Sequence, residues 1–569
     1  MLLSGAMTLS PVLKRSSQSL LIIGPITTLA VSPASNYDPI NLIKILFVSS
    51  LAFFNLGLFL ASPKYIFSRV SKNFLAIISL FVLSMISTLL FSGAPIEQQI
   101  WGSFGRNTGF LTYLSLLIIL IAMSVIQNQF TYHKIVDIVV YTAIPMTIYC
   151  LIQVANLDPI SWSEKHPFGT LGNINFSSAF FGLTSIASFS LILDKSASKV
   201  KKIALLMLII VDQFIVISTG SIQGFMIFIA GVGIVFYIFM SKKANLRIFK
   251  VLYIAISAIA IFFTIYGLSN KGPLAKFLFA PSIVFRTDYW HAGYSMTISH
   301  PIFGVGLDSY GDWYRQARGE ISTLRTGPDR IANTAHNIFL DISSNGGLPF
   351  FVAYVLLNVL ALTAAIRVLK GQSKYSPYFV ALFATWLGYL IQSLISINQI
   401  GVGIWGWMFT GALIGYGYLD KFEEINLKNI RIKNSKKSRR MKSRDSVLPP
   451  LSGLSAIAGL LIGFTLAYIP FSADAKYKSA INLRAMDTII QSTRLLGSSA
   501  FHSELALDTA IKNNLTEQAK EISDYLITKY PRDFMGWKAR WVLSTSTDSQ
   551  KAQAKRKLRA LDPYNPEFK

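Results

Sequence analysis

The sequence predicts an all-α, polytopic helical membrane protein with a large external loop and a small helical domain at its C-terminal end. Of the 569 residues, 52% are hydrophobic and only 14% are charged, whereas soluble domains carry about 25% charged residues. The mean hydropathy is +0.47. A helix of about 20 apolar residues crosses a bilayer core of about 30 Å, and such segments recur along the chain. The composition therefore excludes an ordinary soluble enzyme.

Thirteen apolar segments, each bounded by charged residues, proline or glycine, are candidate membrane-spanning helices. They are residues 19–32, 41–61, 74–92, 109–126, 135–154, 175–193, 203–218, 222–240, 249–268, 345–366, 377–395, 402–419 and 451–470. We therefore expect a membrane domain over residues 1–470. The first segment is short and follows two basic residues, as in a cleaved signal peptide. Its removal would leave the orientation of every later segment unchanged.

Basic residues alternate between the short loops. The N-terminus and every second loop hold 27 lysines and arginines when Lys250, at the start of the ninth segment, is included, whereas the opposite loops hold only Arg106 and Lys165. The positive-inside rule places the N-terminus in the cytoplasm and the C-terminal tail outside. Most of the net charge of +25 is thus a topology signal, which argues against a nucleic-acid partner. The cytoplasmic basic loop, residues 420–450, also suits contact with anionic membrane lipids.

Two larger regions lie outside the predicted spans, an external loop at residues 269–335 and an extracytoplasmic tail at residues 471–569. The tail predicts paired helices whose apolar faces carry Leu505, Leu507, Ala510 and Ile511, and then Ala519, Ile522 and Leu526. Pro531 and Pro563 each end a helix, and their separation of 32 residues is close to a 34-residue helix-turn-helix repeat. One or two degenerate TPR-like repeats are our interpretation, and a plain helical appendage is the alternative.

The external loop departs from the charge pattern because it carries seven basic residues, five of them arginine, whose planar guanidinium suits bidentate contacts with phosphate. They are Lys271, Lys276, Arg286, Arg315, Arg318, Arg325 and Arg330. The alternative is a solvated loop balanced by its own acidic residues. No metal and no cofactor is expected, because the chain has one cysteine, no histidine pair at metal-ligand spacing and no Gly-rich phosphate loop or nucleophile elbow.

One combination of motifs resembles the signature of the bacterial O-antigen ligase and O-antigen polymerase family. It comprises His336-Asn337 followed, after nine intervening residues, by Gly347, the upstream pair Arg286 and Trp290, the stretch His-Pro-Ile-Phe-Gly-Val-Gly at 300–306, and the outer-loop motifs at 105–109 and 172–176. The resemblance covers about residues 100–420. It does not separate ligase from polymerase.

The resemblance implies a helical membrane glycosyltransferase, GT-C-like, with an external loop over its site. Such an enzyme takes a glycan from an undecaprenyl-diphosphate carrier and moves it, without metal, to an acceptor hydroxyl on the outer face of the cytoplasmic (inner) membrane. The implied partners are the lipid-linked glycan, a glycan, lipid or protein acceptor, and membrane lipids. The implied pathway is the synthesis of lipopolysaccharide or another polysaccharide.

The resemblance also suggests roles for individual residues. Arg286 would hold the diphosphate and stabilise its growing charge. His336 would act as base on the acceptor or, as a second possibility, bind the diphosphate. Further substrate-binding candidates are Arg106, Arg330, Gln223, Asn337, Asn173 and Trp290. Many ligases carry a Ser-Arg pair where this chain has Ser221-Ile222-Gln223, so the second cation would be Arg106 or Arg330.

Structural alternatives accompany several of these candidates. Asn173 suits a helix cap, Trp290 an interfacial anchor, and Gly347 close approach of helices.

A different class, a transporter or lipid-glycan flippase, is favoured only by Asp212 within the seventh segment, and the alternative for that carboxylate is pairing with a neighbouring hydroxyl. A scaffold built around the tail would leave the His336 motif without purpose. The tail favours a ligase that docks a partner or acceptor, since helical repeats present binding surfaces.

Overall fold

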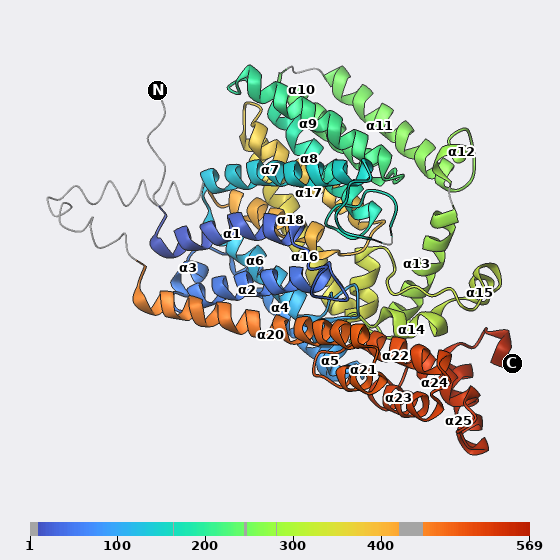
Figure 1. The fold of residues 1–569 in the computed structure, drawn as a ribbon. Helices are drawn as coiled ribbons and strands as arrows, with labels where there is room; N and C mark the ends of the chain where they lie inside the picture. Colours follow the sequence, from blue (N-terminus) through green and yellow to red (C-terminus); the bar gives the residue numbers. More distant parts are fainter. Residues whose placement is uncertain (1–8, 163, 244–246, 280, 420–447, 569) are drawn as a thin grey trace.

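The computed structural model describes residues 9–162, 164–243, 247–279, 281–419 and 448–568. All regular elements in these ranges are helices (Figure 1), which confirms the predicted all-α fold. Most of the predicted basic loop at 420–450 lies outside the described residues.

Each of the thirteen apolar segments coincides with a helix. These helices are α1 (Pro11–Leu29), α2 (Asn41–Leu60), α4 (Lys72–Phe91), α6 (Phe110–Ile126), α7 (Gln129–Val154), α8 (Ile174–Ile192), α9 (Lys199–Ser218), α10 (Gln223–Lys243), α11 (Arg247–Leu268), α16 (Ile338–Gly371), α17 (Pro377–Ser393), α18 (Ile400–Tyr416) and α20 (Pro450–Leu483). Among the described residues, eight helices are long and apolar enough to cross a membrane, and α6 and α18 are shorter apolar helices. The chain is thus an integral membrane protein, while the count of thirteen spans stays a prediction.

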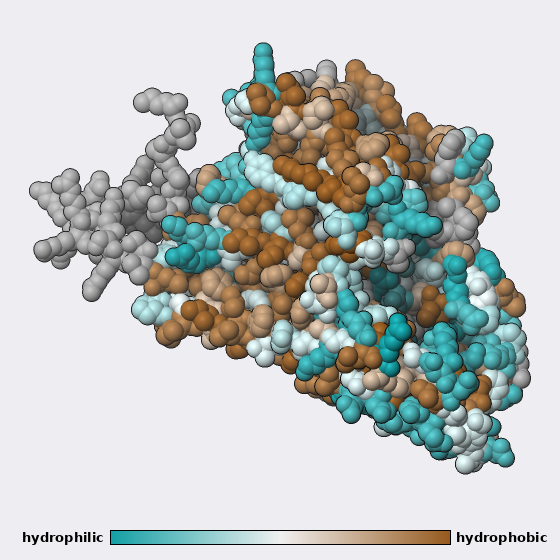
Figure 2. All heavy atoms as spheres, viewed as in Figure 1, coloured by the Kyte–Doolittle hydropathy of each residue, from teal (hydrophilic) through white to brown (hydrophobic). Residues whose placement is uncertain are grey.

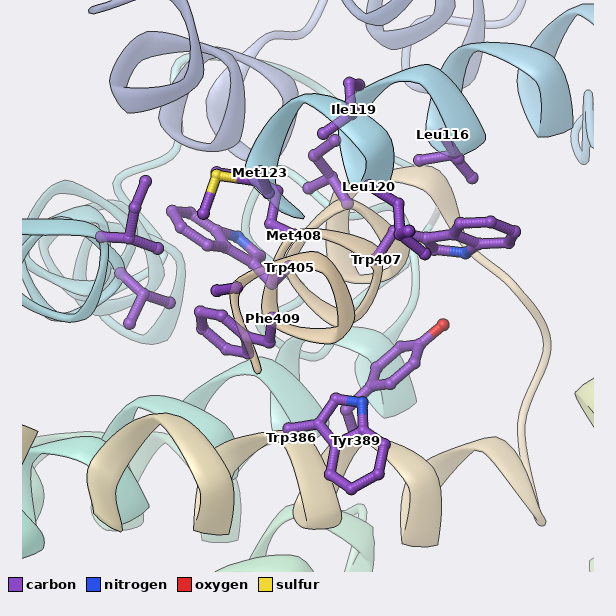
Figure 3. Close-up of a cluster of buried hydrophobic side chains, with 14 of the residues drawn as sticks. Leu116, Ile119, Leu120, Met123, Trp386, Tyr389, Trp405, Trp407, Met408 and Phe409 are labelled. Atoms are coloured by element: carbon purple, nitrogen blue, oxygen red, sulfur yellow. The ribbon is translucent and has the colours of Figure 1, made fainter. Parts of the chain in front are cut away.

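The centre of the bundle is formed by α6, α17 and α18, whose large side chains interlock (Figure 3). Trp386 and Trp405 are fully buried. Their indole N–H groups donate to the hydroxyls of Thr410 and Thr28 at 3.0 and 2.9 Å. Because each buried donor has a partner, these tryptophans contribute apolar contact without the desolvation cost of an unpaired N–H group.

The outside of the bundle is apolar, as Figure 2 shows in the broad hydrophobic surface over the helices. Helix α11 is the extreme case, since none of the residues in its most apolar window is buried and Ile248 is 75% exposed. A lipid environment covers such a surface without cost. Hydrophilic surface gathers instead over the opposite end of the molecule, around α14 and the tail helices.

Small residues let α2 and α20 approach closely. A Cβ atom at Gly57 would lie 2.1 Å from the carbonyl oxygen of Ser455, and one at Gly459 would lie 2.1 Å from that of Phe53. Such contacts are how helices associate within a membrane. Helix α20 does not end near residue 470 but continues through Pro470 to Leu483, so a single helix connects the bundle to the tail.

The tail consists of α21 (Met486–Thr493), α22 (Ala500–Lys512), α23 (Thr516–Lys529), α24 (Phe534–Val542), α25 (Asp548–Leu561) and the 3-10 turn η1 (Pro566–Phe568). The expected apolar faces are buried at Leu507, Ala510, Ala519, Ile522 and Leu526, whereas Ile511 is 40% exposed. The paired helices agree with the predicted arrangement, and their TPR-like character remains a prediction.

The predicted external loop is largely helical. It contains α12 (Ala275–Leu278), α13 (Pro281–Ser299), α14 (Tyr310–Ala317) and α15 (Glu320–Thr326). These elements lie beside the tail and the short helix α5 (Ile96–Trp101) (Figure 1). The remaining short helix, α3 (Lys64–Phe67), follows α2 at the other end of the bundle.

Candidate active site

The motif at residues 300–306 packs directly against the start of α16, the helix that follows the His336-Asn337 motif. The backbone N–H of Val305 donates to the carbonyl of Ser344 at 2.9 Å, and that of Leu348 donates to Pro301 at 2.7 Å. Helix α16 is broken at Gly347, whose φ of 76° and ψ of 175° suit only glycine. These bonds fix the chain that leaves α13 against the start of α16. Gly347 thus permits the close approach of the chain that follows α13, and not of another helix as the structural alternative held.

A second loop, between α5 and α6, is organised by the buried carboxylate of Asp308. Its Oδ2 accepts the backbone N–H groups of Ser103 and Thr108 at 2.7 and 3.0 Å. The Arg106 guanidinium between them donates through Nε and Nη2 to Oδ1 of Asn333 at 3.2 and 3.0 Å. Arg106 is thereby held against the segment that leads to His336.

His336 occupies a left-handed backbone position, with φ of 51°, directly before α16. Asp341, in the first turn of that helix, accepts the N–H of the preceding residue, Ala335, at 2.6 Å. Asn337 is the N-cap, and its Oδ1 accepts the N–H groups of Phe339 and Leu340 at 3.0 and 3.2 Å. Hydrogen bonds on both sides thus fix the backbone of His336, and the side chain of Asn337 is occupied by capping.

The structure brings together Arg106, Arg286 and His336, which lie on three different segments. Burial, followed by the nearby guanidinium groups of Arg106 and Arg286, lowers the pKa of His336 to about 4. The ring of Tyr289, on α13, lies 5.5 Å from the imidazole between centroids. His336 is therefore neutral at neutral pH, and two cations stand close to it.

The arginines of the external loop differ in what they contact. Arg315 and Arg318 form ion pairs with Asp562 of the tail at 3.2 and 2.8 Å, and Arg325 pairs with Asp288. The guanidinium of Arg330 is exposed and lies 4.0 Å above the ring of Phe285.

Within the described part of the chain, Arg286 forms neither an ion pair nor a hydrogen bond. Burial lowers its pKa, but an arginine remains charged at any physiological pH. A half-buried cation without a counterion is costly, so this position suits an anionic ligand.

The other predicted substrate-binding residues are distributed more widely. Asn173 is exposed and caps α8 by accepting the N–H of Asn175 at 2.9 Å. Gln223 begins α10 and is 5% exposed, and neither polar atom of its side chain has a hydrogen-bond partner. Trp290 is half-buried on α13, with a buried indole N–H that also lacks a partner. Gln223 and Trp290 thus carry buried polar atoms without a partner among the described residues, whereas the side chain of Asn173 caps a helix.

Sequence reasoning missed three residues that position the site: Asp308, Asn333 and Asp341. Asp308 and Asp341 line a small cavity together with Arg106. The available signals were weak, since Asp308 counted only as one of several acidic residues in the external loop. Asp341 lies five residues after His336, which is an ordinary place for an acidic residue in the first turn of a helix.

The carboxylate that favoured a transporter is satisfied internally. Asp212 is fully buried, and its two oxygens accept the hydroxyls of Thr147 and Thr184 at 2.7 and 3.2 Å. This is the pairing with neighbouring hydroxyls that formed the alternative interpretation. Lys44, another charged group within a predicted span, donates to the carbonyls of Thr27 and Thr28 at 3.0 and 2.9 Å. Both groups have structural partners.

Comparison with known proteins agrees with the motif resemblance. Residues 178–355 match the family described as O-antigen ligase. This range includes Gln223, Arg286 and His336, whereas Arg106, Asn173 and the tail lie outside it. No curated protein matches the chain. Among the described residues, no three His, Cys, Asp or Glu side chains are grouped so as to hold a metal ion.

Proposed function

Because the match of residues 178–355 supports the O-antigen ligase and polymerase superfamily, we propose that this protein is a membrane glycosyltransferase of the ligase type. Its donor is a glycan carried on undecaprenyl diphosphate, and its acceptor is a hydroxyl group. The reaction takes place on the outer face of the cytoplasmic membrane, where the chain exposes α13–α15 and the tail. In this orientation the N-terminus lies in the cytoplasm.

The observation that carries the proposal is the grouping of Arg106, Arg286 and neutral His336. A diphosphate leaving group gains negative charge as the glycosidic bond breaks, and cations placed in advance at that position stabilise it. Arg286 has no counterion among the described residues, and Arg106 is engaged by the neutral amide of Asn333. The guanidinium of Arg286 can therefore bind phosphate oxygens in bidentate fashion, and that of Arg106 can contribute the N–H groups that Asn333 leaves unused. Arg106 supplies the second cation, because residues 221–223 contain no arginine where many ligases carry one.

The acceptor hydroxyl oxygen attacks the anomeric carbon while the bond from that carbon to the diphosphate breaks, which inverts the configuration. His336 takes the hydroxyl proton, and the diphosphate carries away the electron pair of the broken bond. An imidazole with a pKa of about 4 is deprotonated before reaction, as a base must be. Binding of the anionic diphosphate between the arginines offsets their positive charge and raises the basicity of His336 at that stage.

The test uses a deletion strain complemented with wild type, His336→Asn, Arg286→Gln or His291→Asn. Asparagine is chosen for position 336 because it tolerates the left-handed backbone there. We expect the first two variants to lower transfer about 100-fold or more, with normal amounts of protein in the membrane. His291→Asn, an exposed histidine of α13, is the matched control and retains activity.

Lipid-linked and surface glycans are compared by gel electrophoresis and mass spectrometry. Long chains that remain on the lipid carrier support the ligase. Single repeat units on the carrier indicate instead the polymerase of the same superfamily. Wild-type transfer by His336→Asn and Arg286→Gln contradicts the proposed roles of these residues. Unchanged glycans in the deletion strain itself contradict glycosyl transfer and favour the alternative class, a transporter.

A further inference from the structure

A cavity of about 850 Å³ lies between the tail and the outer end of the bundle. We call it the tail cleft. Its walls come from α5 and the following loop, from α14, from the chain at 329–333 and from the tail helices α22 and α24. The volume falls in the ~300–1,000 Å³ range of sites for small organic ligands. The mechanism proposed above uses none of this space.

The tail cleft is rich in carboxylates and has no free cation. Its acidic lining residues are Glu97, Asp308, Asp312, Asp329, Asp474, Glu504, Asp508 and Asp533. The two arginines in the lining are engaged elsewhere, because Arg315 pairs with Asp562 and Arg532 lies 3.4 Å above the ring of Trp313. A diphosphate is repelled from such a space, so the tail cleft suits a ligand other than the charged part of the donor.

Three carboxyl groups in the lining, Asp308, Asp312 and Asp533, have a pKa above the ordinary value, chiefly because they are buried. Burial raises the pKa of Asp312 to about 6. Burial and the neighbouring carboxyl of Glu504 raise the pKa of Asp533 well above its ordinary value. Partly protonated carboxyls both donate and accept hydrogen bonds. This lining thus matches a neutral, hydroxyl-rich ligand better than a strongly cationic one.

Unpartnered polar atoms point to a ligand independently of the acidic residues. Asn107 lines the tail cleft and is only 5% exposed. Its Nδ2 donates to the carbonyl of Trp101 at 3.3 Å, whereas its Oδ1 has no partner, and the hydroxyl of Ser103 in the same wall also lacks one. Buried acceptors without partners are costly, and hydroxyl groups of a saccharide would satisfy them.

The tail cleft adjoins the candidate active site. Asp308 lines both the tail cleft and the small cavity beside Arg106. Asn333, also in the lining, accepts the guanidinium of Arg106 at 3.0 Å. We propose that the tail cleft binds the neutral saccharide of the acceptor and directs its hydroxyl toward His336, an inference that rests on the proposed glycosyl transfer. The tail thereby forms one wall of the acceptor site.

The test measures binding and transfer separately, with the full chain reconstituted in lipid nanodiscs. The probe is the neutral oligosaccharide released from the surface of wild-type cells by mild acid, and saturation-transfer NMR reports its binding. Asp508→Trp and Met535→Trp fill the cleft from two walls at positions that are 43% and 39% exposed, so their folding is not at risk. Glu517→Trp, an exposed position of α23 away from the cleft, is the matched control.

We expect wild type, the control and His336→Asn to bind the oligosaccharide, and both cleft variants to lose binding. In transfer assays the cleft variants raise the KM for the acceptor about tenfold or more, while the KM for the lipid-linked donor stays within about twofold. Equal binding by the cleft variants and the control overturns the inference, as does a cleft that binds an octalysine peptide in place of the oligosaccharide. Full transfer by His336→Asn contradicts the proposed function instead. In that case the binding measurement alone tests whether the tail cleft holds the oligosaccharide.

Discussion

The electrostatic surroundings of His336 distinguish its two possible roles. A histidine that binds a diphosphate as a cation must be protonated, whereas a base must be neutral. Burial and the two guanidinium groups lower the pKa of His336 to about 4. At neutral pH almost every molecule therefore carries the neutral imidazole, which favours the base.

This environment predicts an unusual pH dependence. The value of kcat/KM reports groups of the free enzyme, and a base is active above its pKa. Wild-type kcat/KM, measured for transfer to the acceptor, should therefore stay flat between pH 7 and 5. In Arg286→Gln one positive neighbour is lost, so the pKa of His336 rises above about 4, while burial and Arg106 still hold it below its ordinary value. The residual activity of that variant should therefore begin to fall at a higher pH than the activity of wild type.

Arg286→Lys is the control for this profile because it keeps the charge while losing the bidentate geometry. Its kcat/KM should drop at every pH, but the further loss of activity on acidification should still occur only below pH 5. If kcat/KM falls near pH 6.5 in wild type and in all variants alike, the assignment of His336 as the base is contradicted.

The sequence was sufficient to single out Arg106, Arg286 and His336 as candidates, because a basic residue in a short outer loop and a family motif can both be recognised from the sequence. Their roles stay predictions. The sequence was insufficient for Asp308 and Asn333. Their role depends on which backbone N–H groups and which guanidinium they meet, at positions about 200 residues away in the chain. Ordinary polar residues in a loop give no sign of such contacts.

At the scale of elements, apolar length predicted where the long helices lie, because the bilayer imposes that length on the sequence. The same reasoning failed to foresee the helical content of the external loop, whose α13 carries Arg286. It also placed the end of a span near Pro470, although α20 continues to Leu483. Both departures occur outside the apolar pattern, where α13 packs against α14 and α16, and α20 continues into contact with α21.

The break in α16 predicts a sensitive position. At Gly347, φ is 76° and a Cβ atom would lie 2.3 Å from the carbonyl oxygen of Ile302. Gly347→Ala should cost about 1–3 kcal/mol through backbone strain alone and should disturb the contact between residues 300–306 and α16. We expect a lower melting temperature and a loss of transfer. Differential scanning fluorimetry of the purified protein and the glycan assay measure the two effects.

Gly371→Ala is the matched control, because it lies at the end of the same helix and a Cβ atom there meets nothing within 4 Å. It should leave stability unchanged or slightly raise it. If both alanine variants melt like wild type, the strained break at Gly347 has no structural importance.

At the scale of the whole molecule, one carboxylate joins the tail to the segment that carries the site. Asp562 is fully buried and accepts Nη2 of Arg318 at 2.9 and 2.8 Å. Arg318 also donates to the carbonyls of Pro328 and Arg330 at 3.0 and 2.9 Å. The last helix of the tail therefore holds, through one arginine, the backbone that continues to Asn333 and His336.

Asp562→Asn should consequently impair the site from a distance. Removing one partner of a buried ion pair leaves the charge of Arg318 uncompensated, which costs about 3–5 kcal/mol. The chain at residues 327–333 should then exchange its amide hydrogens faster, and transfer should fall although no residue of the site has changed. Hydrogen exchange followed by mass spectrometry measures the first effect. Asp524→Asn removes a more exposed partner of Arg540 in the same tail and should cost at most about 1 kcal/mol. Equal exchange at residues 327–333 in both variants would show that the tail does not position the external loop.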